Sequence, residues 1–127
     1  MLFKQIQVFQ LNQVVTNLEE KLNAFAFSEC LPSLPSTNGW VPPLEDEANP
    51  LLTRTIDGNI IFSLQIEEKL LPATVIRQQL QEKINHIETM EARKVRQKEK
   101  LQLKDELTHT LLPRAFSKFT KIYAYID

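Results

Sequence analysis

Basic side chains cluster in one stretch of twelve residues in the second half of the chain. Residues 93–104 hold six basic side chains and one acidic side chain, Glu99. The basic residues are Arg93, Lys94, Arg96, Lys98, Lys100 and Lys104. Such a density of cations is the pattern expected of a local anion-binding patch. The segment is a candidate phosphate-binding patch. Charge alone leaves open a solvated helix face laced with ion pairs.

A second candidate follows Pro113, where basic and aromatic residues are interleaved. Arg114 and Lys118 stand among Phe116 and Phe119. Cations beside aromatic rings suit phosphate neutralisation with base stacking, and aromatic residues also suit a contact between subunits. Arg114 and Lys118 are therefore candidate phosphate contacts, and the two phenylalanines are candidates for base stacking or for a subunit contact. The alternative is a turn whose phenylalanines belong to the core.

Residue types that carry out catalysis are sparse. His86 and His109 have no Cys, Asp or Glu at a dependable metal-ligand spacing. Because Gly39 and Gly58 are the only glycines, the chain has no glycine-rich phosphate-binding loop. The serines lack the context of a nucleophile elbow. We expect no catalytic activity, no cofactor and no metal.

The basic patch lies within a segment expected to be helical, residues 72–112. Pro72 suits a first helical turn, and no proline or glycine follows until Pro113. Two apolar stripes at helical spacing flank residues 96–100, which are polar all round. The stripes are Ile76, Leu80, Ile84 and Ile87, and then Leu103, Leu107 and Leu111. We favour one helix of roughly 60 Å with buried ends and an exposed, overhanging middle. A helical hairpin turning near residues 96–100 is the alternative.

The other segments predict a small antiparallel sheet and a short helix. Alternating apolar residues favour a strand over residues 2–11, and a capping residue favours a helix over residues 17–27. The Asp57-Gly58 turn joins strands at 51–55 and 59–66, and residues 118–127 favour a last strand. The predicted fold class is α+β, a small antiparallel sheet packed with a short helix and one long, partly overhanging helix.

The length of the chain is that of a single domain, and its composition divides it into three parts. Residues 1–71 are an α+β part with a Pro-rich loop at 30–50, residues 72–112 are the basic helical segment, and residues 113–127 are a turn and a truncated strand. Residues 1–72 carry four basic and nine acidic side chains, whereas residues 73–127 carry eleven and seven. Because no partner strand follows the last one, we expect a fragment of a longer protein.

Two features indicate a cytoplasmic protein that does not enter a membrane. Cys30 is the only cysteine, which is typical of a reducing compartment. No apolar run approaches the roughly 20 residues that span a bilayer.

Several motifs follow one another along the chain: the start MLFK, residues 39–43 (GWVPP), residues 67–72 (EEKLLP) with Val75-Ile76, and residues 103–107 (LKDEL) running into 111–117 (LLPRAFS). Taken together, they resemble the RdgC family of bacterial recombination-associated DNA-binding proteins. The likeness extends over essentially all of the chain. It corresponds to the N-terminal part of family members that continue well beyond Asp127.

The resemblance implies a nucleoid-associated protein of the cytoplasm without catalytic activity. In such proteins, two subunits close into a ring around duplex DNA, bind single- and double-stranded DNA with little sequence preference, and restrain RecA-dependent recombination by competing with RecA on DNA. The basic residues named above are then the expected DNA contacts, and Phe116 and Phe119 the expected dimer contact. The alternative is a protein-interaction module whose long helix docks on a partner, without direct DNA contact.

Overall fold

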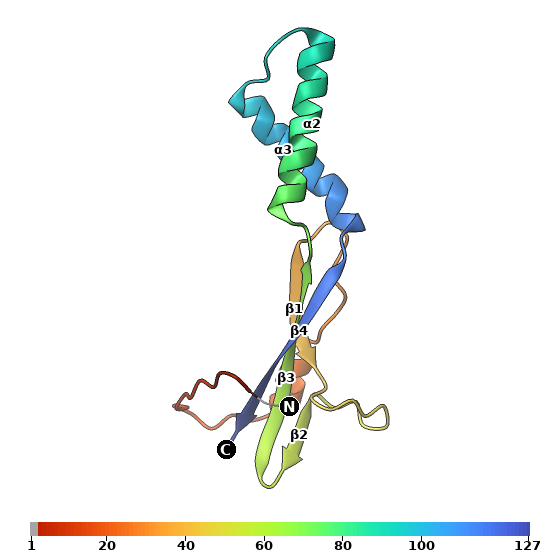
Figure 1. Cartoon of the computed structure of the whole chain (residues 1–127). Coiled ribbons are helices and arrows are strands. Elements are labelled where there is room, and N and C mark those ends of the chain that lie inside the picture. The colour runs from red at the N-terminus through yellow and green to blue at the C-terminus, as the bar shows by residue number, and fades with distance from the viewer. Residues whose placement is uncertain (1–2) are drawn as a thin grey trace.

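The computed structural model describes residues 3–127 of the chain. Figure 1 shows an elongated molecule in which a twisted sheet carries a helical hairpin at one end. The opposite end of the sheet, here called the foot, carries a short helix, long loops and the C-terminal end of the chain.

Three strands follow the first helix, and the two longer helices separate them from the last strand. The elements are α1 (Leu18–Asn23), β1 (Ser36–Val41), β2 (Thr53–Ile56), β3 (Asn59–Lys69), α2 (Ala73–Glu91), α3 (Gln97–Leu111), the 3-10 turn η1 (Leu112–Arg114) and β4 (Ser117–Ile126). All strand pairs of the sheet are antiparallel. The predicted α+β class is confirmed.

Strand β3 is the centre of the sheet. β4 pairs along one edge of β3 from residue 60 to residue 69. The other edge is shared by β2, which pairs with residues 59–62, and by β1, which pairs with residues 63–68. The predicted Asp57-Gly58 hairpin is confirmed, since both residues have the positive φ that its turn requires (50° and 82°). Among residues 3–127, the outer edge of β4 pairs with no strand.

The long helix predicted over residues 72–112 is interrupted, so the single-helix interpretation is wrong and the hairpin alternative is correct. α2 ends at Glu91, and α3 begins at Gln97, slightly before the expected turn. Ala92 closes α2 in the left-handed conformation, with φ of 49°. The two apolar stripes pack against each other, which buries Ile84 and Leu107. This packing replaces the two separate cores expected at the ends of one helix.

Two other expectations for the first part of the chain are wrong. Residues 3–11 form no strand, and residue 2 lies outside the described residues. The loop predicted at 30–50 contains β1, and the predicted helix ends at Asn23 rather than near Phe27.

Close packing explains why a glycine-containing segment forms β1. A side-chain Cβ at Gly39 would lie 2.4 Å from the Cα of Phe27, so only glycine allows these two backbones to approach. The N–H of Phe27 donates to the carbonyl of Trp40 at 2.9 Å, and the N–H of Trp40 donates to the carbonyl of Phe25 at 3.0 Å. The Trp40 ring packs edge-on against Phe62, with centroids 5.4 Å apart. Trp40 is therefore part of the sheet's packing.

The described hydrophobic core is small and divided between the two ends of the molecule. Leu22 and Leu52 are buried in the part built around the sheet, and four residues are buried in or beside the hairpin: Ile84, Val95, Leu107 and Leu112. The total accessible surface is 10469 Å² for a chain of 14.8 kDa. A compact monomer of that mass exposes only about 7,000 Å². The chain is thus far more exposed than a compact domain.

Candidate nucleic-acid interface

The hairpin presents a tip, residues 92–98, at the end remote from the sheet (Figure 1). Helix α2 leads up to it and α3 leads away, and their packed seam fixes where the tip stands. Val95 closes the end of the seam with only 6% of its surface exposed. Its N–H donates to Oε2 of Glu88 at 3.3 Å. A buried side chain and a satisfied backbone group therefore hold this short connection in place.

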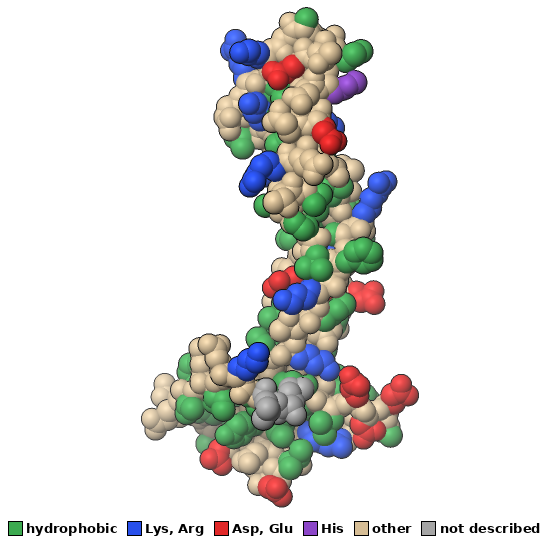
Figure 2. Space-filling model, viewed as in Figure 1, with side chains coloured by type: hydrophobic (Ala, Val, Ile, Leu, Met, Phe, Trp, Pro, Cys, Tyr) green, Lys and Arg blue, Asp and Glu red, His purple; other side chains and the backbone are tan. Residues whose placement is uncertain are grey.

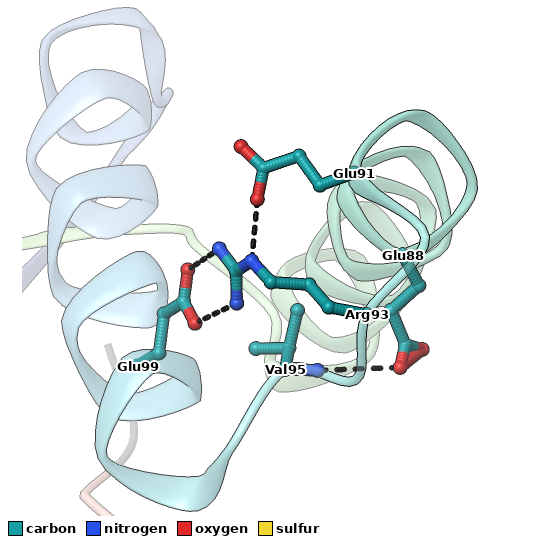
Figure 3. Close-up of polar contacts among 5 residues, drawn as sticks. All are labelled: Glu88, Glu91, Arg93, Val95 and Glu99. Atoms are coloured by element: carbon teal, nitrogen blue, oxygen red, sulfur yellow. Dashed lines mark hydrogen bonds and ion pairs between the residues drawn. The ribbon is translucent and has the colours of Figure 1, made fainter.

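Arg93 ties the two helices together across the tip, as Figure 3 shows. Its Nη1 and Nη2 donate to the two carboxylate oxygens of Glu99, each at 2.8 Å, and its Nε donates to Oε2 of Glu91 at 2.5 Å. The bonds to Glu99, and then to Glu91, raise the pKa of Arg93, and Arg93 lowers the pKa of the Glu99 carboxyl. Two carboxylates therefore balance this cation, and Arg93 orders the tip that carries its neighbours.

Three other cations at the tip have no such partner. Lys94, Arg96 and Lys98 are exposed, and among residues 3–127 none of them forms an ion pair with a carboxylate. Together with Arg93, Glu99 and Gln102 they line an open hollow of about 540 Å³. On the face in Figure 2, Lys and Arg side chains lie over both the hairpin and the lower half of the molecule, whereas most Asp and Glu side chains lie over the lower half. The tip therefore offers unpaired positive charge to an anion.

The other predicted DNA-binding residues are not brought to the tip. Lys100 is half-buried and Lys104 is exposed, and both lie further along α3. Arg114 lies in η1 and Lys118 on β4, at the opposite end of the hairpin. Because α3 has 15 residues, its length of roughly 22 Å separates these two groups of cations. The predicted set thus divides into a cluster at the tip, which Lys100 and Lys104 extend along α3, and a separate pair, Arg114 and Lys118, at the other end of the hairpin.

The aromatic residues after Pro113 are not core residues. Phe116 is 84% exposed and Phe119 is 56% exposed. Both lie near the neck, here defined as residues 70–72 and 112–116, which joins the sheet to the hairpin. The N–H of Leu70 donates to the carbonyl of Phe116 at 2.7 Å, so the backbone is fixed while the ring faces outward. Their interpretation as core residues is wrong, and a dimer contact stays a prediction.

A polar groove on α2 was missed by the sequence analysis. It has a volume of about 450 Å³ and is lined by Thr74, Arg77, Gln78, Gln81, Glu82 and Asn85. The side chain of Gln81 donates to that of Asn85 at 2.8 Å. The spacing of three and four residues between these polar side chains was the available signal, since it places them on one helix face.

No candidate catalytic centre emerges from the described residues. Across residues 3–127, no three His, Cys, Asp or Glu side chains are grouped so that they could hold a metal ion. In the same part of the chain, no helix is both long and apolar enough to cross a membrane.

Comparison with known proteins gives a consistent family assignment. Residues 1–127 match the family model described as "Putative exonuclease, RdgC". Proteins named "Recombination-associated protein RdgC" from Sodalis glossinidius (strain morsitans) and Yersinia pestis (strain Pestoides F) are each 40% identical over 129 residues. Each match covers 98% of this chain and 42% of the relative. The chain thus spans about two fifths of the length of the curated relatives it matches.

Proposed function

This chain belongs to the RdgC family, and from that premise we propose that it binds DNA through its hairpin tip as part of a recombination-associated protein. The observation that carries the proposal is the cluster of Lys94, Arg96 and Lys98 at the end of a projecting hairpin, without carboxylate partners among the described residues. Phosphates of DNA are the anions that such a cluster suits. The relatives' names connect the family with recombination, a process that takes place on DNA.

The proposed binding has little sequence preference and includes single- and double-stranded DNA. Contacts to phosphate position a protein on DNA but carry no direct sequence information. Lys100 and Lys104 would extend the contact along α3, and Arg114 and Lys118 would add phosphate contacts near the neck. The bound protein would restrain recombination by competing with RecA for the same DNA.

In a complete family polypeptide, the proposal includes a ring-shaped homodimer through which DNA passes, in the cytoplasm and associated with the nucleoid. Phe116 and Phe119 support it, because exposed aromatic side chains are expensive to leave in water and typical of subunit contacts. A ring would retain DNA by enclosure, so individual phosphate contacts need not be strong.

Fluorescence anisotropy of labelled DNA over a salt series tests the proposal on the 127-residue chain. Binding through phosphates gives log affinity a steep linear dependence on log salt, with a slope of about −0.9 for each neutralised phosphate of duplex DNA. We expect the double variant Lys94→Gln, Lys98→Gln to make this slope shallower by roughly two. The matched control is Lys4→Gln, Lys21→Gln, which removes two exposed lysines far from the tip along the chain.

Two results would contradict tip binding. One is unchanged affinity in the tip variant with a normal circular dichroism spectrum; the other is an equal loss in the control. Salt-insensitive association of the hairpin with a protein partner, without DNA binding, would favour the interaction module instead.

We propose binding without hydrolysis, although the family description contains the word exonuclease. Incubation of end-labelled DNA with the chain and Mg²⁺ should release no nucleotides. Release that increases with protein concentration, and that a separate purification reproduces, would contradict this part of the proposal.

A further inference from the structure

The N-terminal segment 3–15 exposes an unusual amount of apolar side chain. Seven of its residues are large hydrophobic residues of which a third or more of the surface is exposed: Phe3, Ile6, Val8, Phe9, Leu11, Val14 and Val15. Val8 and Val14 are the extremes at 89%. Exposed apolar surface of this extent is typical of a surface that another part of a protein covers.

The backbone of the same segment is also unpaired. Among the described residues, no hydrogen bond involves a residue from 3 to 15. Over residues 5–8, polar and apolar side chains alternate as in a strand, which would place Ile6 and Val8 on one side and Gln5 and Gln7 on the other. The segment therefore has the pattern of a strand but lacks the neighbour that a strand needs.

One contact anchors the start of this segment to the sheet. The Phe3 ring packs edge-on against Tyr123 of β4, with centroids 5.9 Å apart. Figure 1 shows the segment looping out from the foot, near the end of β4. The outer edge of β4 is also unpaired among residues 3–127. The backbone N–H and C=O groups of this edge and of segment 3–15 therefore both lack hydrogen-bond partners in the same region.

We propose that residues 3–15 are a docking strand for the part of a full-length RdgC-family polypeptide that this chain does not match. The chain spans 42% of its relatives, so more than half of each relative is available to cover the segment. A partner in the same polypeptide is present at an effective concentration near the millimolar range, which favours strand addition without strong individual contacts. The accessible surface of this chain is larger than that of a compact domain of the same mass, which also indicates that further protein covers part of it.

A second copy of this chain fits the segment less well. Residues 1–72 carry nine acidic and four basic side chains. A symmetric contact through the foot would place two negatively charged surfaces against each other. The proposal depends on family membership and not on DNA binding, so either can fail without the other.

Hydrogen exchange followed by mass spectrometry tests the proposal on two proteins. One is the 127-residue chain, and the other is the full-length Sodalis glossinidius relative with its matching part replaced by this chain. We expect residues 3–15 to exchange at nearly the unprotected rate in the short chain and roughly a hundredfold more slowly in the long polypeptide. If the replacement polypeptide does not fold, the aligned peptides of the unmodified relative provide the same comparison.

A matched pair of variants tests whether the apolar side chain of Val8 causes the protection of residues 3–15. Val8→Asp and Gln7→Asp should both leave the melting temperature of the short chain unchanged, because both positions are exposed there. In the long polypeptide, Val8→Asp should restore fast exchange at residues 3–15, whereas Gln7→Asp should keep them protected. Fast exchange in both wild-type proteins would overturn the proposal. Protection of the short chain that rises with its concentration would also overturn it, because the partner would then be a second copy.

Discussion

Arg93 and Lys94 are neighbours of the same charge at the hairpin tip, yet their surroundings give them different roles. The guanidinium of Arg93 bonds to two carboxylates on the flanking helices, a geometry that its planar fork suits and an ammonium does not. Lys94 is exposed and has no carboxylate partner within residues 3–127. Arg93 thus positions the tip, and Lys94 is the better candidate for a phosphate contact.

Glu67 is a carboxylate whose environment makes the stability of the chain depend on pH. It is 5% exposed, and it accepts hydrogen bonds from the Ser117 hydroxyl at 2.6 Å and from the Cys30 N–H at 2.9 Å. The bond from Ser117, followed by that from Cys30, lowers the pKa of Glu67. A lowered pKa in the folded state stabilises the fold above the unfolded pKa, and this contribution is lost as the pH falls through the folded value.

We therefore expect the melting temperature to fall as the pH decreases below roughly 4.3, the ordinary pKa of a glutamate. Glu67→Gln should lower the melting temperature at pH 7 and make its decrease in acid shallower. Glu68→Gln is the matched control, because the neighbouring carboxylate is exposed. Thermal unfolding from pH 7 to pH 3 measures all three proteins. An acid-induced decrease in Glu67→Gln as steep as in the wild type would contradict the assignment.

The end of helix α2 stores an unfavourable backbone conformation. Ala92 has φ of 49° and ψ of 43°, a left-handed conformation that glycine adopts more easily than alanine. Ala92→Gly should therefore increase the free energy of unfolding by about 1 kcal/mol. Ala115→Gly is the control, since Ala115 is extended with φ of −75° and should gain nothing from glycine. Urea unfolding compares them, and a loss of stability in Ala92→Gly would contradict the prediction.

Local sequence predicted most elements but not the break between α2 and α3. Residues 92–96 (ARKVR) contain neither glycine nor proline, so composition favoured a continuous helix. The break depends instead on contacts between the two helices, namely the packing of α2 against α3, in which Ile84 and Leu107 are buried, and the bonds of Arg93 to Glu99. The basic cluster could be predicted from residue types alone. The sequence could not predict which of these cations form ion pairs, because the pairing depends on where the turn places Glu91 and Glu99.

The strands show the same division between local and tertiary information. The alternation of residues 59–66 and the Asp57-Gly58 turn predicted the β2–β3 hairpin correctly. Residues 3–11 have an equally good strand pattern but no partner among the described residues, and a strand forms only when it is paired. β1 has a poor pattern, yet it forms because it pairs with β3, and Gly39 in addition allows the chain at Phe27 to approach.

The whole molecule combines a small core with a strong separation of charge. Acidic residues predominate in residues 1–72, and basic residues predominate in the part that contains the hairpin. A polyanion such as DNA would attract the hairpin and repel the foot, which orients the molecule with its tip toward the nucleic acid. In the proposed DNA complex, the apolar segment 3–15 would lie on the side away from the DNA, where the proposed docking partner could cover it.

Substitutions at two residues of the neck should distinguish an effect on folding from an effect on the proposed dimer. Leu112 is 6% exposed, whereas Phe116, four residues later, is 84% exposed. Leu112→Ala should therefore reduce the free energy of unfolding of the 127-residue chain by about 2–5 kcal/mol, and Phe116→Ala should change it by less than about 0.5 kcal/mol. In a full-length polypeptide carrying this chain, Phe116→Ala should weaken the proposed dimer by roughly tenfold or more, because exposed aromatic side chains often dominate subunit contacts. Sedimentation equilibrium measures the dissociation constant of the dimer. An unchanged constant for Phe116→Ala would show that the Phe116 side chain is not part of the subunit contact, and the predictions for folding stability would be unaffected.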